Sequence, residues 1–258
     1  MSLSKNIREK IENLLKKTIR DKLEHYQPET EHMPFHHRLL GKDKYALFSF
    51  IQSMNTTFGI SIWEQVAIIL AEGAGYFAER QFKLLGEINE GTEQIINEIH
   101  HNLRKGESSP NKLDEIRQIR NVIHQGKPKK HPDSIVDLYL KINNDEFFFD
   151  ITSAKPNMKE FAVLKLKLLR WTALKLSLDK NANVFTRLAI PYNPYHPKPY
   201  ERWTLKGLFD MENYEVMIGE EFWNFVAGGN IYEELLEVFE NVGQELRYEI
   251  DEKFSNFR

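Results

Sequence analysis

The chain has 258 residues, of which 41% are hydrophobic and 28% charged, and its formal net charge is −3. This composition is typical of a folded soluble domain; it excludes a disordered chain and gives no compositional sign of a strongly basic nucleic-acid-binding domain. The absence of cysteine excludes disulfides, thiolate metal sites and cysteine nucleophiles, and it favours a cytoplasmic location. We expect no transmembrane helix, because no run of 18 apolar residues occurs, and no signal peptide, because the N-terminus is charged.

The first half of the chain is predicted to be helical. Apolar residues at helical spacing indicate an amphipathic helix over residues 3–24, followed by a loop over residues 27–43. Further helices are expected at 44–54, 61–85, 87–104 and 112–124, with a break at residues 55–59 and a basic loop at 125–132.

The second half begins with a β-hairpin. Residues 135–142 and 146–153 alternate with period two and are rich in β-branched and aromatic side chains, and Asn143 and Asn144 lie between them. After the hairpin we expect a helix, a strand, a Tyr-rich loop, a short strand and two closing helices, at residues 158–178, 184–190, 191–203, 215–218 and beyond.

This order of elements predicts one α/β domain over residues 1–258, with a mixed sheet flanked by helices and an N-terminal helical layer. Its parts would be an N-terminal helix within residues 1–30, a core over residues 60–205, and a C-terminal strand and helices over residues 215–258.

The register of the hairpin sets two acidic residues opposite each other. A two-residue turn at Asn143–Asn144 gives favourable pairs, namely Leu138 with Phe149, Leu140 with Phe147, and Lys141 with Glu146. The same register sets Asp137 opposite Asp150, where like charges with Cβ atoms roughly 4.5–5.5 Å apart repel each other. A divalent cation between the carboxylates would remove this penalty, and hard oxygen ligands suit Mg²⁺. The alternative is a three-residue turn, which would shift the register and leave both aspartates solvated.

Glu64 is a second acidic residue in an unfavourable place. It lies on an apolar stripe of its predicted helix, with Ile60, Ala67, Ile68 and Ala71 as neighbours. A buried carboxylate is costly unless it is paired or binds metal, so Glu64 is a candidate third acidic group of the metal site. Equally, it could be a glutamate at the edge of the helix whose side chain reaches solvent.

These residues resemble a known family. Asp137, the hairpin and the sequence DITSAKPN at residues 150–157 resemble the PD-(D/E)XK motif of a group of type II restriction endonucleases. The segments GISIWEQVAIILA, which contains Glu64, and GEEFWNFVAGGNIYEELLEVF at residues 219–239 are similar to segments of the same group. The resemblance covers about residues 36 to 240, and three segments in order are more specific than the acidic motif alone. Members of this group are similar to enzymes that cut GG-CC sites with a central unspecified base.

The resemblance implies that the protein cuts double-stranded DNA and leaves 5′-phosphates. Asp137, Asp150 and the backbone carbonyl of Ile151 would bind Mg²⁺, with Glu64 nearby, and a lysine would orient or deprotonate the attacking water. The family pattern has this lysine two residues after the second acid, where this chain has Thr152. Lys155, in a Ser-Ala-Lys arrangement, is the candidate replacement, provided that Pro156 ends or bulges the strand and turns the lysine toward the site.

Basic and aromatic residues near this motif are candidates for DNA contact. They are Lys130 before the hairpin, Asn157 after it, and Tyr195, Lys198 and Arg202 in the Tyr-rich loop. The lysines along residues 158–178 are interpreted mainly as a solvated helix face. No Gly-rich phosphate loop is present, so no organic cofactor is expected. A palindromic target favours a homodimer, with the N-terminal and last helices as candidate interfaces.

Three other interpretations remain open from the sequence. The protein could be a repair or transposon-type nuclease of the same fold. It could be a catalytically weak or inactive nucleic-acid-binding protein on a nuclease scaffold, because Thr152 stands where a lysine is expected. An all-helical interaction module is the third, and the hairpin argues against it.

Overall fold

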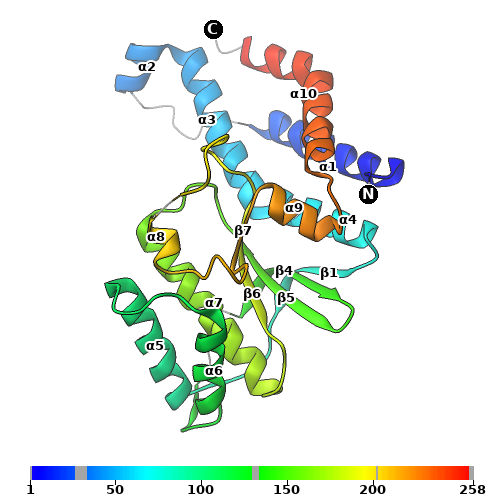
Figure 1. Ribbon diagram of the computed structural model, residues 1–258. Helices are drawn as coiled ribbons and strands as arrows, with labels where there is room; N and C mark the ends of the chain where they lie inside the picture. The colour runs from blue at the N-terminus through cyan, green and yellow to red at the C-terminus, as the bar shows by residue number, and fades with distance from the viewer. Residues whose placement is uncertain (1, 27–33, 130–133, 202, 256–258) are drawn as a thin grey trace. The chain divides into compact units, whose positions relative to one another are not determined.

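The computed structural model describes residues 2–26, 34–129, 134–201 and 203–255 (Figure 1). The chain divides into two compact units. We call residues Met1–Leu70 with Gly229–Arg258 the helical unit, and residues Ala71–Gly228 the sheet unit. Within the described ranges, no helix is long and apolar enough to cross a membrane.

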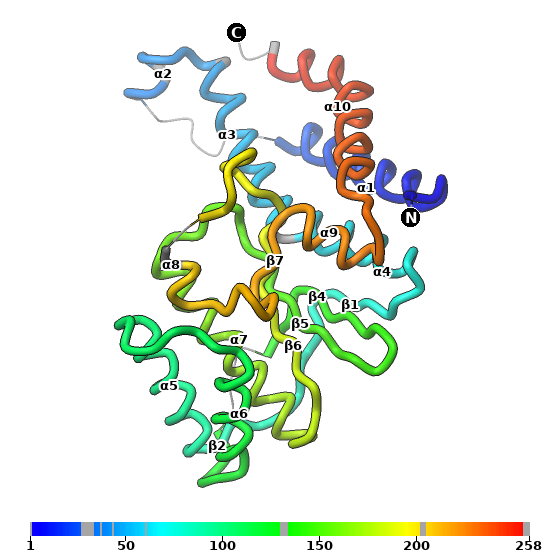
Figure 2. Tube along the Cα trace, in the orientation of Figure 1, coloured from blue at the N-terminus to red at the C-terminus, as the bar shows by residue number. Residues whose placement is uncertain are grey.

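The helical unit is built around two long helices that lie side by side, α1 (Lys5–His25) and α10 (Tyr232–Ser255) (Figure 2). Ser4 begins α1 as its N-cap, because its hydroxyl accepts the backbone N–H of Ile7. Three ion pairs join the helices, Arg8–Glu234, Lys16–Glu245 and Arg20–Glu249. The unit also contains α2 (Pro34–Leu40), α3 (Lys42–Thr57), the π-helical turn η1 (Phe58–Ile62) and most of α4 (Trp63–Gly73).

The predicted break at residues 55–59 is wrong. The helix continues from α3 through η1 into α4, and the extra residue is absorbed by a π-helical turn. Asn55 and Gly59 are poor helix formers, but their cost of about 1 kcal/mol or less each does not end this helix. A small apolar core of Leu23, Tyr26, Phe50 and Met54 holds α3 against α1.

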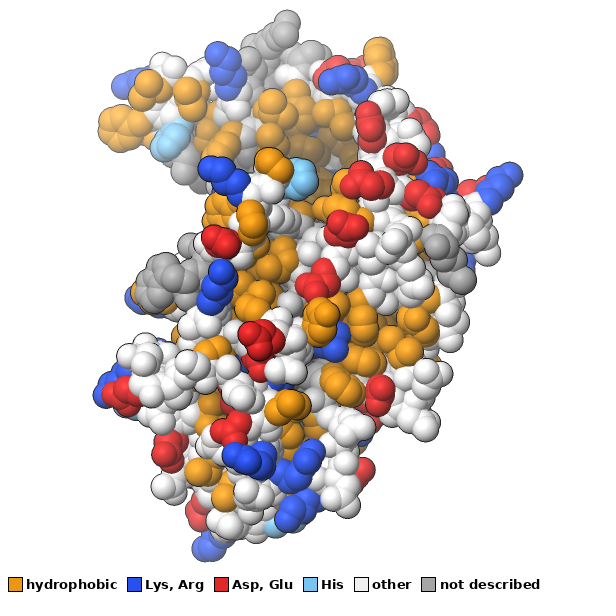
Figure 3. Space-filling view, viewed as in Figure 1, with side chains coloured by type: hydrophobic (Ala, Val, Ile, Leu, Met, Phe, Trp, Pro, Cys, Tyr) orange, Lys and Arg blue, Asp and Glu red, His pale blue; other side chains and the backbone are white. Residues whose placement is uncertain are grey.

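The helical unit also carries an exposed apolar surface on α2 and α3. Figure 3 shows hydrophobic side chains gathered over α2. The exposed residues are Phe35, Leu39, Leu40, Leu47, Phe48 and Ile51.

A five-stranded mixed sheet forms the centre of the sheet unit, in the order β1-β4-β5-β6-β7. The strands are β1 (Phe77–Lys83), β4 (Ile135–Ile142), β5 (Asp145–Ile151), β6 (Phe185–Ile190) and β7 (Val216–Ile218). The pairs β1–β4 and β4–β5 are antiparallel, whereas β5–β6 and β6–β7 are parallel. A two-stranded sheet of β2 (Ile88–Asn89) and β3 (Pro128–Lys129) lies apart from it.

Strand β1 was not predicted, because residues 61–85 were expected to form one helix. The helix α4 instead ends at Gly73, and Gly75 adopts a φ of +80° that a side chain would strain. The residues that follow pair along almost the whole of β4. This pairing gives β4 a neighbour on both sides, which is why the tertiary structure overrides the helical spacing.

The remaining helices of the sheet unit are α5 (Glu90–Lys105), α6 (Lys112–Val122), α7 (Met158–Leu178), α8 (Trp203–Lys206) and α9 (Glu220–Ala227). Helix α7 has the predicted bounds, and its N-terminus is fixed by a capping box in which Asn157 accepts two backbone N–H groups. Side chains alternate across β5, so that Phe148 packs on the α7 side with Tyr139, while Phe147 and Phe149 pack on α9.

The lysines of α7 do not form a solvated face, contrary to the prediction. Lys165 is fully buried, and its ammonium bonds to Glu115 at 2.7 Å and to Glu215 at 2.8 Å. Lys112 of α6 bonds to the same Glu215 at 3.0 Å. These four side chains form an enclosed charge network between α6, α7 and the strands. The sequence interpretation failed here because it had no partner element to place over this helix face.

Candidate functional site

The hairpin of β4 and β5 has the predicted register. Leu138 pairs with Phe149, Leu140 with Phe147, and Lys141 with Glu146. The turn is closed by Asn143 with a φ of +56°, a conformation that asparagine tolerates. The alternative three-residue turn is therefore wrong.

Asp137 and Asp150 occupy the next opposed positions of that register, just beyond its last paired residues. Because side chains alternate along a strand, both carboxylates lie on the face of the sheet that carries Tyr139 and Phe148. Asp137 is half-buried, and its Oδ2 accepts the backbone N–H of Ile151 at 2.8 Å. This hydrogen bond fixes the orientation of the Asp137 carboxylate, and its donor is the residue that directly follows Asp150.

Asp150 is buried at 4% exposure and forms an ion pair with Lys167 of α7. The Lys167 ammonium also lies 4.8 Å from the ring centre of Trp171, one turn further along the helix. About a quarter of the Lys167 side chain remains exposed. A cation on the helix therefore offsets part of the charge that the two aspartates bring together.

The residues at this point suit a divalent cation. Carboxylate oxygens of two aspartates and a backbone carbonyl are hard ligands, and Mg²⁺ is usually bound in proteins by one or two carboxylates with several waters. Among the described residues, no group of three or more His, Cys, Asp or Glu side chains is placed so that it could hold a metal ion. A site with two carboxylates is compatible with that finding, because water and phosphate supply the other ligands of Mg²⁺.

The two residues after Asp150 complete the end of β5. Ile151 is buried and is the last residue of the strand. Thr152 follows it, half-buried, and its backbone N–H donates to the Ala189 carbonyl at 3.0 Å. Thr152 thus keeps the strand register at the position where the family pattern has its lysine.

Lys155 lies in the bend after β5 and is exposed. Its ammonium sits over the ring of Tyr195, 5.3 Å from the ring centre. Tyr195 in turn packs edge-on against Tyr200, whose hydroxyl donates to the Ala154 carbonyl at 3.0 Å. The structure therefore brings together the bend at residues 152–157 and the Tyr-rich loop, two segments that were both predicted to lie near DNA.

The other predicted contact residues are placed as follows. Asn157 uses its side-chain oxygen to cap α7. Lys198 is exposed, its backbone N–H donates to the Tyr195 carbonyl at 2.9 Å, and its own carbonyl accepts from the Asn193 amide at 2.8 Å. Lys130 and Arg202 lie outside the described residues.

Glu64 is on α4 and is only 2% exposed, so it is not a glutamate that reaches into solvent at the helix edge. It belongs to the helical unit, whereas both aspartates belong to the sheet unit. Its part in the metal site stays a prediction.

Arg187 of β6 lies on the face of the sheet opposite to the two aspartates. Its guanidinium lies within 4.8–5.8 Å of the ring centres of Phe147, Phe185 and Phe225. Burial among these rings lowers the pKa of Arg187 to about 10, against the attraction of Glu221. Arg187 therefore packs between the sheet and α9.

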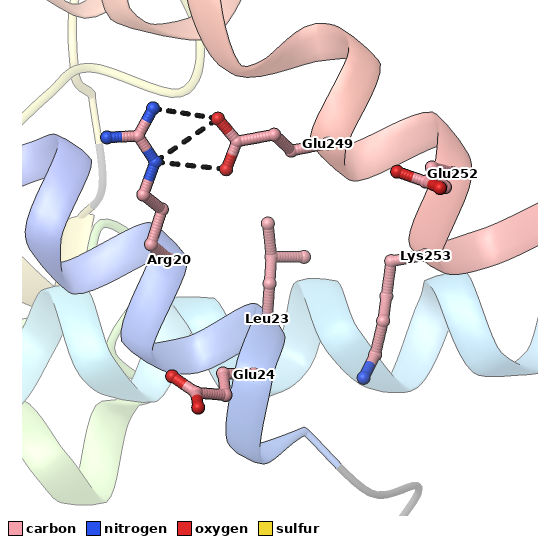
Figure 4. Close-up of a pocket in the computed structure, with 6 residues that line it drawn as sticks. All are labelled: Arg20, Leu23, Glu24, Glu249, Glu252 and Lys253. Carbon is pink, nitrogen blue, oxygen red and sulfur yellow. Dashed lines mark hydrogen bonds and ion pairs between the residues drawn. The ribbon is translucent and has the colours of Figure 1, made fainter.

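A pocket in the helical unit lies between α1 and α10 (Figure 4). Arg20 and Glu249 form three hydrogen bonds of 2.7–3.1 Å across it, and Glu24, Glu252, Leu23 and Lys253 complete its lining. None of the predicted site residues lines this pocket.

Sequence reasoning did not place Lys167 beside Asp150. Lys167, Trp171 and Lys175 recur every four residues and so share one helix face, but this spacing does not say whether the face meets solvent or a sheet. Lys175 forms an ion pair with Glu146 just as Lys167 does with Asp150. Glu146 and Asp150 lie on one face of β5, so two basic side chains on one face of α7 meet two acidic side chains on one face of the strand.

Comparison with known proteins shows the family of the chain. The model of the HinfI type II restriction endonuclease family matches residues 3–243. The type II restriction enzyme MjaII of Methanocaldococcus jannaschii is 26% identical over 95% of this chain and 72% of its own length. HgiCII and HgiEI of Herpetosiphon aurantiacus are 27% and 29% identical over 85% of this chain and 81% and 80% of theirs. No solved structure matches the chain. This chain belongs to the HinfI family of type II restriction endonucleases.

Proposed function

We propose that this enzyme hydrolyses double-stranded DNA at a specific sequence, with Mg²⁺ as its metal, and that its products carry 5′-phosphates. The observation that supports this most strongly is the opposed pair of Asp137 and Asp150 at the end of the hairpin. A fold gains no stability from two like charges at such positions, whereas a divalent cation needs them.

Asp137, Asp150 and the Ile151 carbonyl would hold the metal, with Glu64 as a further carboxylate. The metal, when bound, supplies a Lewis acid at the scissile phosphate and a water of lowered pKa. In the reaction the water oxygen bonds to phosphorus while the bond from phosphorus to the 3′ oxygen breaks. One water proton passes to solvent and the 3′ oxygen takes one up, giving a 5′-phosphate and a 3′-hydroxyl. The Ile151 N–H holds the Asp137 carboxylate in place throughout.

The DNA would be held by the bend after β5 and the Tyr-rich loop. Lys155 and Lys198 are exposed cations there, and Tyr195 links the two segments. We assign phosphate contact to the lysines and to Lys130 and Arg202, and contact with base edges to Asn157.

We further propose that residues 1–258 act as one restriction-endonuclease domain, as a homodimer, in the cytoplasm. A two-fold dimer matches the symmetry of a palindromic site.

Incubation of the purified protein with phage DNA tests this function. Discrete bands in Mg²⁺, absent in EDTA, are expected, and sequencing of their ends gives both the recognition site and the position of the 5′-phosphate. Diffuse degradation would instead indicate a repair-type nuclease.

A second candidate function is a DNA-binding protein with little or no cleavage. It is favoured by Thr152, which leaves the usual lysine position without a charge. DNA binding that persists in EDTA, with no cleavage in Mg²⁺ or Mn²⁺, would establish it.

A further inference from the structure

In the proposed hydrolysis a cationic side chain would act beside the scissile phosphate together with the metal, and the strand does not supply one. Charge builds up on the phosphate oxygens as water attacks, and a donor fixed at that point lowers the barrier. Thr152, two residues after Asp150, is uncharged, and Lys155 stands over the Tyr195 ring in the bend.

We propose that Lys167, carried by α7, is the catalytic lysine of this enzyme. Its ammonium contacts Asp150 directly, and it would donate to the attacking water or to a phosphate oxygen once DNA and metal occupy the site. The proposal rests on the proposed function, because it assigns a role within that hydrolysis.

The contact is built into the helix face. Lys167, Trp171 and Lys175 are spaced four residues apart on α7. The indole of Trp171, between the two lysines, is fully buried. The ring centre lies 4.8 Å from the Lys167 ammonium, so the cation is positioned by packing as well as by Asp150.

Lys167 also remains accessible from solvent. A quarter of its side chain is exposed, in contrast to Lys165, which is enclosed between Glu115 and Glu215. A lysine that only offset a buried charge would not need this opening. A lysine that must reach the substrate has to be accessible from solvent.

Lys175 provides a matched control. It lies on the same helix face two turns later, forms an ion pair with a carboxylate of the same strand, Glu146, and has a similar exposure of 17%. Lys175→Met removes an equivalent ion pair at the other end of β5, away from the aspartate pair. Any difference between the two variants therefore measures the place of Lys167 beside Asp150 rather than the loss of an ion pair.

The experiment compares wild type, Lys167→Met, Lys175→Met, Lys155→Ala and the double variant Lys167→Met with Thr152→Lys. Single-turnover cleavage of a duplex carrying the mapped site is measured in Mg²⁺. Affinity for the same duplex in Ca²⁺ and the thermal midpoint without metal are measured alongside.

Lys167→Met is expected to slow cleavage by about 10²–10³-fold. Its affinity in Ca²⁺ should stay within about threefold, and its thermal midpoint should match that of Lys175→Met, which should cleave within about threefold of wild type. Introducing Thr152→Lys should recover at least about tenfold of the lost rate, because it returns a cation to the strand position.

Two results would overturn the assignment while leaving the endonuclease intact. One is equal cleavage by Lys167→Met and Lys175→Met. The other is loss of cleavage in Lys155→Ala with near-normal cleavage in Lys167→Met. Absence of cleavage by the wild type would instead overturn the proposed function, and this assignment with it.

Discussion

Asp150 interacts with a cation even without metal, because the Lys167 ammonium bonds to its carboxylate. Replacing Asp150 by asparagine removes a metal ligand and a negative charge at once. Cleavage should fall by at least about 10²–10³-fold, whereas DNA affinity without metal should rise, because one source of repulsion for phosphate is gone. Single-turnover rates in Mg²⁺ and equilibrium binding in EDTA check both expectations.

Asp145→Asn is the control for this prediction, since Asp145 begins the same strand at the turn, opposite Ile142. It should leave rate and affinity near the wild-type values. Cleavage by Asp150→Asn at a wild-type rate would remove Asp150 from the metal site.

The two aspartates were predictable from sequence and the lysine was not, for a physical reason. Side chains on a strand alternate strictly, so a turn of known length fixes which residues oppose each other, and Asp137 and Asp150 followed. A lysine on a helix has no such constraint: whether its face meets solvent or a sheet depends on packing between distant elements. Lys155, closer in sequence, instead stands over Tyr195.

Among the elements, the bend after β5 and the Tyr-rich loop should act as one phosphate-binding surface. Lys198→Ala should weaken binding to specific and nonspecific DNA alike. It should also reduce the slope of log K against log salt by about 0.9, the value for one lost phosphate contact. Binding titrations in Ca²⁺ at several salt concentrations measure the slope.

Lys180→Ala is the matched control for Lys198→Ala, because Lys180 is an exposed lysine beyond the C-terminal end of α7, whereas the bend lies at its N-terminal end. Its slope should stay at the wild-type value. Equal slopes for wild type and Lys198→Ala would place the loop away from DNA.

The buried charge network between α6, α7 and β7 should govern the acid stability of the sheet unit. Burial alone would raise the pKa of Glu215, but Lys112 and Lys165 outweigh it and hold the pKa below its usual value. This stability is present above the usual glutamate pKa of 4.5 and is lost as pH falls through the lower folded value. Burial raises the pKa of Glu115, so protonation of Glu115 acts in the opposite direction.

Glu215→Gln should therefore cost about 3–5 kcal/mol at pH 7, because two buried lysines lose their shared partner. Glu115→Gln should cost less, since Lys165 keeps Glu215. Urea unfolding at pH 7 and pH 4 measures both. Equal costs, or an unchanged acid dependence in Glu215→Gln, would contradict this account.

The elements themselves were predicted unevenly. The hairpin and α7 were placed correctly, because alternation, turn residues and a capping box are local signals. Strand β1 was missed, because its sequence becomes a strand only through its pairing with β4, far along the chain. The periodicity of a short sequence segment does not reveal contacts between segments so far apart in the chain.

The prediction that concerns the intact enzyme is homodimerisation. A palindromic site presents the same bases twice around a two-fold axis, so two copies of the chain should bind it together. We expect sedimentation at micromolar concentration to give twice the mass of the 30.5 kDa chain. The interface is predicted on the outer faces of α1 and α10, whose inner faces are already joined by ion pairs.

Tyr248 on α10 is 76% exposed and tests that interface. A glutamate at this position would place a charge in the contact, so Tyr248→Glu should shift the enzyme toward monomer. Double-strand cleavage should fall in proportion to the loss of dimer, because each copy of the chain is expected to cut one strand. Phe48→Glu, on the exposed apolar surface of α3, serves as the comparison. If Phe48→Glu dissociates the dimer and Tyr248→Glu does not, the interface lies on α3 rather than on α10. A wild type that sediments as a monomer on its DNA would instead require the two strands to be cut in separate binding events.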